Sequence, residues 1–110
     1  RKDSYVNELF KFKMKGGNRQ QSLIDRLLIS AMIEARSCER FKTLSENIKD
    51  EKLAKFYHDL MVCEAGHYTL FLGFARKYGE GIDVDKQWKS LIEFEGEIIK
   101  KYGKKETIHG

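Results

Sequence analysis

Three side chains with metal-binding chemistry interrupt the apolar faces of two expected helices. Glu34 stands on the face of the first helix, and Glu64 and His67 stand on that of the second. Because burying an unpaired charge is costly, a carboxylate on such a face needs a compensating partner. A Glu-x-x-His pair joined by a Glu from a neighbouring helix is the repeating half of a di-iron carboxylate site in helical bundles. Carboxylate and imidazole together suit iron or manganese, so these three residues are predicted metal ligands.

The spacing along the chain brings the two carboxylates to the same height. If residues 20–48 and 51–78 form an antiparallel hairpin, Glu34 lies sixteen residues before Asp50 and Glu64 lies fourteen after it. At a rise of about 1.5 Å per residue, their heights differ by only about 3 Å. Glu39 is the obvious rival to Glu34, but five residues turn it roughly 140° away at about 100° per residue. Glu39 is therefore rejected as a ligand.

The elements that position these residues are helices, since apolar spacing is helical throughout and proline is absent. We expect helices over about 4–14, 20–48, 51–78 and 84–102. The helices are expected to begin at Asp3 or Ser4, at Asn18 with Gln21 as a capping box, at Asp50 and at Asp83. The first, third and fourth are expected to end at Gly16-Gly17, at Gly79 as a C′ residue and at Gly103. The inward stripe of the third helix is expected to comprise Leu53, Phe56, Leu60, Glu64, His67, Phe71 and Phe74.

Several other polar or reactive residues have a structural interpretation that outweighs a functional one. Glu95 is expected to face inward in a polar core or beside the metal rather than on it. His58 and His109 are not expected to bind metal. Cys38 and Cys63 are expected to be small buried hydrophobes, and Tyr57 and Tyr68 are expected to pack against other aromatic rings. Arg36 and Arg40 lie off the buried stripe, where pairing with Glu39 or nearby acids is favoured over binding to nucleic-acid phosphates.

Composition limits the function classes. The 110 residues are 41% hydrophobic and 35% charged, which indicates one folded domain rather than a disordered chain. The longest apolar stretch, 27–33, is interrupted by Ser30 and is far short of the roughly 20 residues that cross a bilayer. Two cysteines make no disulfide framework, so a reducing, cytoplasmic location is expected. The net charge of +4 and the basic run Lys11, Lys13, Lys15 and Arg19 fit either an RNA-facing surface or a solvated helix face.

Four segments together resemble a known enzyme family. They are 25–28 (DRLL), 33–41 (IEARSCERF), 53–57 (LAKFY) and 64–68 (EAGHY). The similarity extends from about residue 19 to 99 and resembles the tRNA hydroxylases that act on 2-methylthio-N6-isopentenyladenosine, a ferritin-like non-haem di-iron group. The resemblance implies a ferritin-like helical bundle in which Glu34, Glu64 and His67 match the second half of the family's iron ligands. It also implies a dioxygen-dependent monooxygenase that hydroxylates the isopentenyl group beside the anticodon, with tRNA as substrate and a separate electron donor.

The ligand set departs from the family pattern in one respect. The second Glu-x-x-His of the sequence, Glu106 and His109, lies in the expected tail rather than in a helix pair, whereas a complete di-iron site needs two such pairs in the bundle. We therefore expect residues 1–103 to be the C-terminal part of a ferritin-like di-iron bundle, with 104–110 as a frayed tail. The other ligands would come from a preceding helical hairpin or from a second copy. The competing hypotheses are a ferritin-like iron-binding protein without hydroxylase activity and a metal-free helical interaction module.

Overall fold

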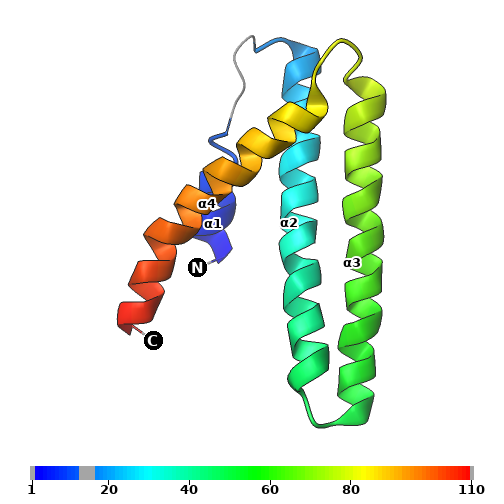
Figure 1. Cartoon of the computed structure of the whole chain (residues 1–110), viewed down its shortest axis with the longest axis vertical. Coiled ribbons are helices and arrows are strands. Elements are labelled where there is room, and N and C mark those ends of the chain that lie inside the picture. The colour runs from blue at the N-terminus through cyan, green and yellow to red at the C-terminus, as the bar shows by residue number, and fades with distance from the viewer. Residues whose placement is uncertain (1, 13–16, 110) are drawn as a thin grey trace.

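The protein is built from helices in the part of the chain that the structure describes. A computed structural model describes residues 2–12 and 17–109, with side chains over 4–12 and 17–101. Figure 1 shows the four helices within these ranges, which are α1 (Lys2–Leu9), α2 (Arg19–Asn47), α3 (Glu51–Tyr78) and α4 (Val84–His109). The prediction of an all-α chain is confirmed. No helix within these ranges is long and apolar enough to cross a membrane.

The long α2–α3 hairpin agrees with the prediction to within one residue at each end. The Asn18 side chain accepts a hydrogen bond from the Gln21 amide at 2.7 Å, which begins α2. The Gln21 side-chain oxygen, which would accept the return bond of a capping box, accepts from the Gln87 side chain at 3.0 Å instead. Asp50 begins α3 by accepting from two backbone amides of the first turn, at 2.9 and 3.2 Å. These caps fix where the two helices start and therefore their relative height.

Gly79 ends α3, but not as the left-handed C′ residue that its type predicts. Its φ is −95°, and the positive φ of this turn belongs to Gly81 at 83°. Glycine is required for space: a Cβ at Gly79 would lie 2.6 Å from the Ala75 carbonyl oxygen and 2.7 Å from a Val84 methyl. The tight passage of the chain past Val84 turns α4 back across α2.

Both flanking helices differ in length from the prediction. The helix α1 spans Lys2–Leu9, whereas the sequence predicts 4–14. The expected cap Ser4 therefore lies inside the helix. The expected stop at Gly16 lies outside the described residues. The expected stop of α4 at Gly103 is wrong, since its helical backbone continues to His109. A single glycine inside a helix costs only about 1 kcal/mol, too little to end a helix of this length.

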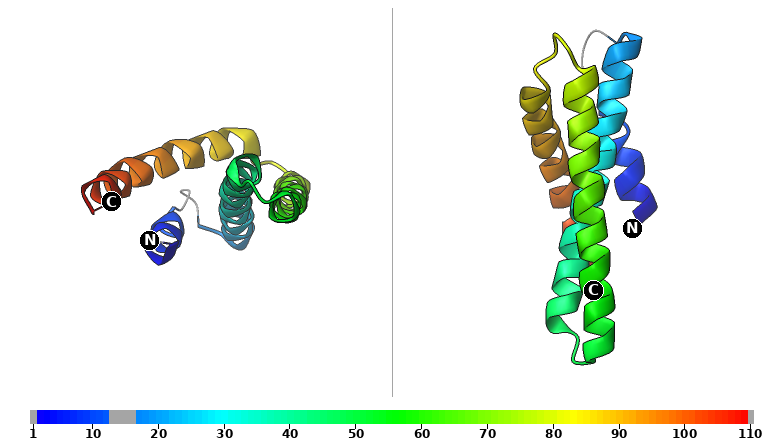
Figure 2. Two further views of the ribbon diagram at one scale, coloured as in Figure 1. Left: turned by 90° about the horizontal axis from the view of Figure 1, so that it is seen from below. Right: turned by 90° about the vertical axis from the view of Figure 1, so that its right-hand side faces the viewer.

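The buried core lies between α1, α4, the N-terminal half of α2 and the C-terminal part of α3. On α2, Ile24 and Ala31 are buried, and Leu28, Ile29 and Met32, which extend around the helix to a second face, are buried as well. Two faces are needed because α2 lies between α3 on one side and α1 with α4 on the other (Figure 2). The core comprises Leu9, Phe12, Ile24, Leu28, Ile29, Ala31, Met32, Leu72, Ala75, Val84, Leu91 and Ile98.

The inward stripe expected of α3 is only partly buried. Leu60, Glu64 and Phe71 are half-buried, whereas Leu53, Phe56 and Phe74 are exposed. The prediction that the whole stripe packs inside is therefore wrong for this chain. The face that α3 turns towards α2 is rotated from that stripe, and its most deeply buried residues are Leu72 and Ala75.

Candidate metal centre

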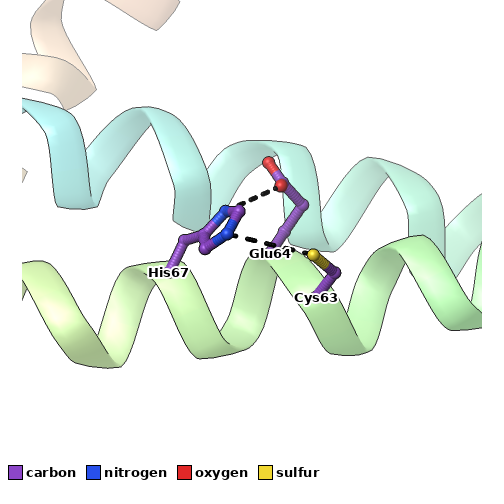
Figure 3. A group of neighbouring side chains, drawn as sticks. All are labelled: Cys63, Glu64 and His67. Atoms are coloured by element: carbon purple, nitrogen blue, oxygen red, sulfur yellow. Dashed lines mark hydrogen bonds and ion pairs between the residues drawn. The ribbon is translucent and has the colours of Figure 1, made fainter.

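The three predicted ligands meet at the middle of the α2–α3 hairpin. His67 Nδ1 lies 3.2 Å from Glu64 Oε1 on the same helix and 3.8 Å from Glu34 Oε2 on α2. Figure 3 shows the Glu64 carboxylate and the His67 ring facing each other on α3, with α2 behind them. The matched heights that the capping residues impose therefore place carboxylates from two helices around one imidazole nitrogen.

Glu34 carries a buried carboxylate oxygen in this cluster. Its side chain is 22% exposed, and its Oε2 atom is buried with no hydrogen-bond partner among the described residues. Burial raises the pKa of Glu34 to about 7, and the neighbouring Glu64 carboxyl raises it further than His67 lowers it. An orphaned buried carboxylate oxygen is unusual, because such groups are almost always paired.

The donor set fits a hard divalent cation. Two carboxylates and one imidazole converge on a space that already contains an unsatisfied oxygen, and a cation there would remove the burial penalty. The cluster is open on one side, since the His67 side chain is 49% exposed. The residues therefore fit one half of a two-metal carboxylate site, with room for further ligands on the open side.

The second imidazole nitrogen of His67 faces a cysteine. Cys63 Sγ lies 3.9 Å from His67 Nε2, and together with Glu64 these residues form a compact group of potential donors on α3. Cys63 is exposed, so its expected role as a buried hydrophobe is wrong. Cys38 is half-buried and its thiol lies 3.5 Å from the Met61 carbonyl oxygen, which agrees with a packing role. A thiol beside Nε2 is a contact that the helical spacing of four residues could have indicated.

A buried ion pair lies two residues along α2 from Glu34. Glu95 of α4 is 1% exposed and accepts hydrogen bonds from the Arg36 guanidinium and from the Tyr5 hydroxyl, the latter at 2.6 Å. Burial and Glu95 raise the pKa of Tyr5 above its ordinary value. Arg36 also contacts the exposed Glu39 at 2.5 Å. The expected ion pairing of Arg36 is confirmed, and the network joins α1, α2 and α4 behind the candidate ligands.

The other residues considered from the sequence do not join the cluster. Glu39 is 66% exposed and points to Arg36, and His58 is exposed. Tyr57 stacks on Phe41, and the Tyr68 ring lies 5.9 Å from that of Trp88, so aromatic packing is confirmed for both tyrosines. The Arg40 guanidinium contacts the Ser37 hydroxyl and the Phe41 ring. The His109 side chain lies outside the described residues.

The basic run near the N-terminus is only partly described. Lys11 is exposed and pairs with Glu8 at 3.2 Å, and Arg19 is exposed. Phe12 is buried against Phe94, with ring centroids 5.4 Å apart. Lys13 and Lys15 lie outside the described residues, so the choice between an RNA-facing surface and a solvated face remains open for this run.

Comparison with known proteins assigns the family. The model of the tRNA-(ms2io6A)-hydroxylase (MiaE) family matches residues 3–110. The chain belongs to the MiaE family. This family is ferritin-like and uses non-haem di-iron, which agrees with an all-α chain carrying two carboxylates and a histidine at one point of a helix pair.

The chain spans less than half the length of two MiaE relatives that it matches. It is 39% identical over 87 residues to the tRNA 2-(methylsulfanyl)-N(6)-isopentenyladenosine(37) hydroxylase of Pseudomonas putida. It is 40% identical over 78 residues to the protein of the same name from Salmonella typhimurium. The matches cover 79% and 71% of this chain, but only 42% and 28% of the relatives. No solved structure matches the chain significantly.

Proposed function

We propose that this chain contributes half of the di-iron centre of a tRNA hydroxylase that acts on the isopentenyl group of 2-methylthio-N6-isopentenyladenosine beside the anticodon. The observation that carries the proposal is the convergence of Glu34, Glu64 and His67 around an unsatisfied buried oxygen in a MiaE-family chain. Both relatives bear the name of that activity. The substrate would be tRNA in the cytoplasm, with dioxygen and an electron donor as further reactants.

Glu34, Glu64 and His67 would hold iron through two carboxylates and Nδ1. Iron bound there would supply the dioxygen chemistry that hydroxylates an allylic C–H bond of the isopentenyl group. Burial raises the pKa of the Glu34 carboxyl to about 7, so a cation held there would compete with a proton for the carboxylate. The Arg36–Glu95 pair behind the ligands holds the middle of α2 against α4, which keeps Glu34 at the height of His67.

The remaining iron ligands would come from outside this set of three residues. A di-iron carboxylate centre of this type uses a Glu from each of two helices and a Glu-x-x-His from each of two others. Glu34 supplies one such Glu, and Glu64 with His67 supplies one such Glu-x-x-His. A preceding helical hairpin or a second copy of the chain would supply the rest at the open side of His67.

Iron binding tests the ligand assignment directly. After anaerobic loading with ferrous ion and desalting, we expect bound iron in the wild-type chain and at least about a tenfold loss of affinity in Glu64→Ala. Glu39→Ala is the matched control, because it removes a carboxylate from the same hairpin that pairs with Arg36 instead. Iron retained by Glu64→Ala but lost from Glu39→Ala would show that the wrong face has been assigned.

Nucleoside analysis tests the reaction. tRNA from a strain lacking the gene should contain 2-methylthio-N6-isopentenyladenosine without its hydroxylated form. An unchanged level of the hydroxylated nucleoside would refute the tRNA assignment. Bound iron combined with unchanged nucleosides would leave a ferritin-like iron-binding protein as the function.

A further inference from the structure

We propose that the rings of Tyr68 and Trp88 form a relay that carries oxidising equivalents from the metal centre to the protein surface. The inference rests on the proposed function, since iron at Glu34, Glu64 and His67 would be the source of those equivalents. The relay itself rests on a separate observation, which is a contact between the only tryptophan of the chain and the tyrosine that follows a ligand.

The Tyr68 ring of α3 and the Trp88 ring of α4 are in direct contact. Their centroids lie 5.9 Å apart and their planes are tilted by 49°, which is the geometry of a packed aromatic pair. Neither ring makes another ring contact within the described ranges. An electron vacancy on either ring therefore has one aromatic neighbour, which is the other ring.

Tyr68 is also joined to the ligand-bearing turn of α3 by the backbone. It follows His67 directly, so the Cα atoms of the two residues are about 3.8 Å apart. Successive residues of a helix point about 100° apart, so the phenol points away from the direction of the imidazole and towards α4. One peptide unit thus connects the ring that would bind metal with the ring that contacts Trp88.

Trp88 is the outer end of the relay. Both rings are half-buried at the edge of the hydrophobic core, so solvent reaches part of each ring. Trp88 belongs to α4, which carries none of the proposed ligands and crosses α2 after the chain leaves the end of the hairpin (Figure 1). A reductant in solution can therefore reach Trp88 without entering the space between the metal ligands.

Phenol and indole suit this role because each gives one electron to a strong oxidant and takes it back. In the first step, Tyr68 gives one electron to the oxidised centre and its phenol proton to water. The phenoxyl radical then takes the indole N–H hydrogen atom of Trp88, as an electron and a proton, which restores the phenol. A thiol or ascorbate in solution gives a hydrogen atom to the indolyl radical. Both rings then return to their starting state, and the centre has gained one electron.

The relay would protect a reactive group beside the ligands. Cys63 is exposed, and its Sγ atom lies 3.9 Å from His67 Nε2. Oxidation of a thiol to the sulfinic or sulfonic acid is essentially irreversible. When no substrate is bound, Cys63 and Tyr68 therefore compete for the same oxidising equivalent, and transfer through Tyr68 spares the thiol.

Pulse radiolysis of the metal-free chain tests the contact between the rings. Azide radicals oxidise indole faster than phenol, and Trp88 is the only tryptophan, so the first radical forms there. Because the contact passes an electron in either direction, we expect the indolyl radical to convert to a tyrosyl radical at a rate independent of protein concentration. Tyr68→Phe should abolish this conversion. Tyr57→Phe is the matched control, since Tyr57 is also half-buried but stacks on Phe41.

The same pulse applied to the ferrous-loaded chain tests the connection to the ligands. Iron(II) would give one electron to the Tyr68 radical, so we expect the tyrosyl radical to disappear faster than in the metal-free chain as iron(III) forms. Glu64→Ala, which should not hold iron, should show the metal-free rate.

Peptide mapping tests the protective role. The ferrous-loaded chain is exposed to dioxygen without substrate or added reductant, and its oxidised residues are then located. We expect oxidation products at Trp88 in the wild type and mainly at Cys63 in Tyr68→Phe. Ascorbate added to the wild type should leave Trp88 unmodified.

The outcomes separate the relay from the proposed function. An indolyl radical that decays equally in the wild type and in Tyr68→Phe overturns the relay. Bound iron that leaves the lifetime of the tyrosyl radical unchanged also overturns it, but keeps the ligand assignment intact. Equal oxidation of Cys63 in the wild type and in Tyr68→Phe overturns the protective role. Conversion between the rings in a chain that binds no iron refutes the proposed function instead. Circular dichroism verifies that every variant keeps its helices.

Discussion

Replacing Arg36 by Met should destabilise the fold strongly, because it leaves the carboxylate of Glu95 buried without its cation. Glu95 is 1% exposed and receives two guanidinium hydrogen bonds and one from the Tyr5 hydroxyl. Met keeps most of the apolar stem of Arg, so the substitution removes mainly the charge. After it, only Tyr5 still donates to the carboxylate among the partners described.

The magnitude follows from the two exposures. Breaking a buried ion pair from one side costs about 3–5 kcal/mol. The Arg36 side chain is 38% exposed, so water can reach part of the vacated space, and we expect about 2–4 kcal/mol after that discount. For a chain of this size, such a loss corresponds to a fall in Tm of roughly 10–15 °C.

Two controls isolate the cause. Glu39→Ala removes the exposed partner of the same arginine and should cost less than about 0.5 kcal/mol. Glu95→Gln keeps an acceptor for Tyr5 and removes the buried charge, so it should cost only about 1–2 kcal/mol. In the double variant, Arg36→Met should lose most of its effect, because a neutral amide needs no cation.

Urea unfolding of the metal-free chain, followed by circular dichroism, measures the four free energies of unfolding. The reasoning fails if Arg36→Met costs no more than Glu39→Ala. It also fails if the costs of Arg36→Met and Glu95→Gln simply add in the double variant, since independent costs would mean that Glu95 does not depend on Arg36 for its burial.

Two further predictions concern backbone space and protonation. Gly79→Ala should lower the free energy of unfolding in urea by about 1–3 kcal/mol, because its Cβ would collide with Val84. Gly73→Ala is the control: its Cβ would meet nothing within 4 Å, so it should stabilise the helix by up to about 1 kcal/mol. Equal effects of the two variants would contradict the steric role of Gly79. Since burial raises the pKa of Glu34 from 4.5 to about 7, its contribution to metal-free stability is full below pH 4.5 and is lost as the pH rises through about 7. Stability curves of Glu34→Gln should lack this decline, and a parallel curve for the variant would refute the shift.

The hairpin and its ligand cluster were predictable because they depend on local rules. Asn18 and Asp50 are strong capping residues, and once they set the helix starts, the rise per residue decides that Glu34 and His67 meet. Pairing of Arg36 followed in the same way from its position three residues before Glu39. These features need only the periodicity of a helix and the chemistry of neighbouring side chains.

The errors concern which helix faces are covered and how far helices extend. Periodicity shows that Leu28 and Met32 share a side of α2, but only the arrangement of α1 and α4 decides that this side is buried. Likewise, nothing local distinguishes Gly103, which α4 passes through, from Gly79, which ends α3. At Gly79 the deciding factor is Val84, a contact made only after the chain has turned.

The misplaced α3 residues all lie on one surface. Leu53, Phe56 and Phe74 were predicted to be buried for the same reason as His67, namely an apolar stripe at helical spacing. All four are exposed here and lie on one face of α3. Exposed apolar area costs about 25 cal/mol per Å² relative to burial, so a face of this length favours association. Covering it would bury these side chains and close the open side of His67 in one step, so a single partner surface would both satisfy the apolar pattern and shield the candidate ligands from water.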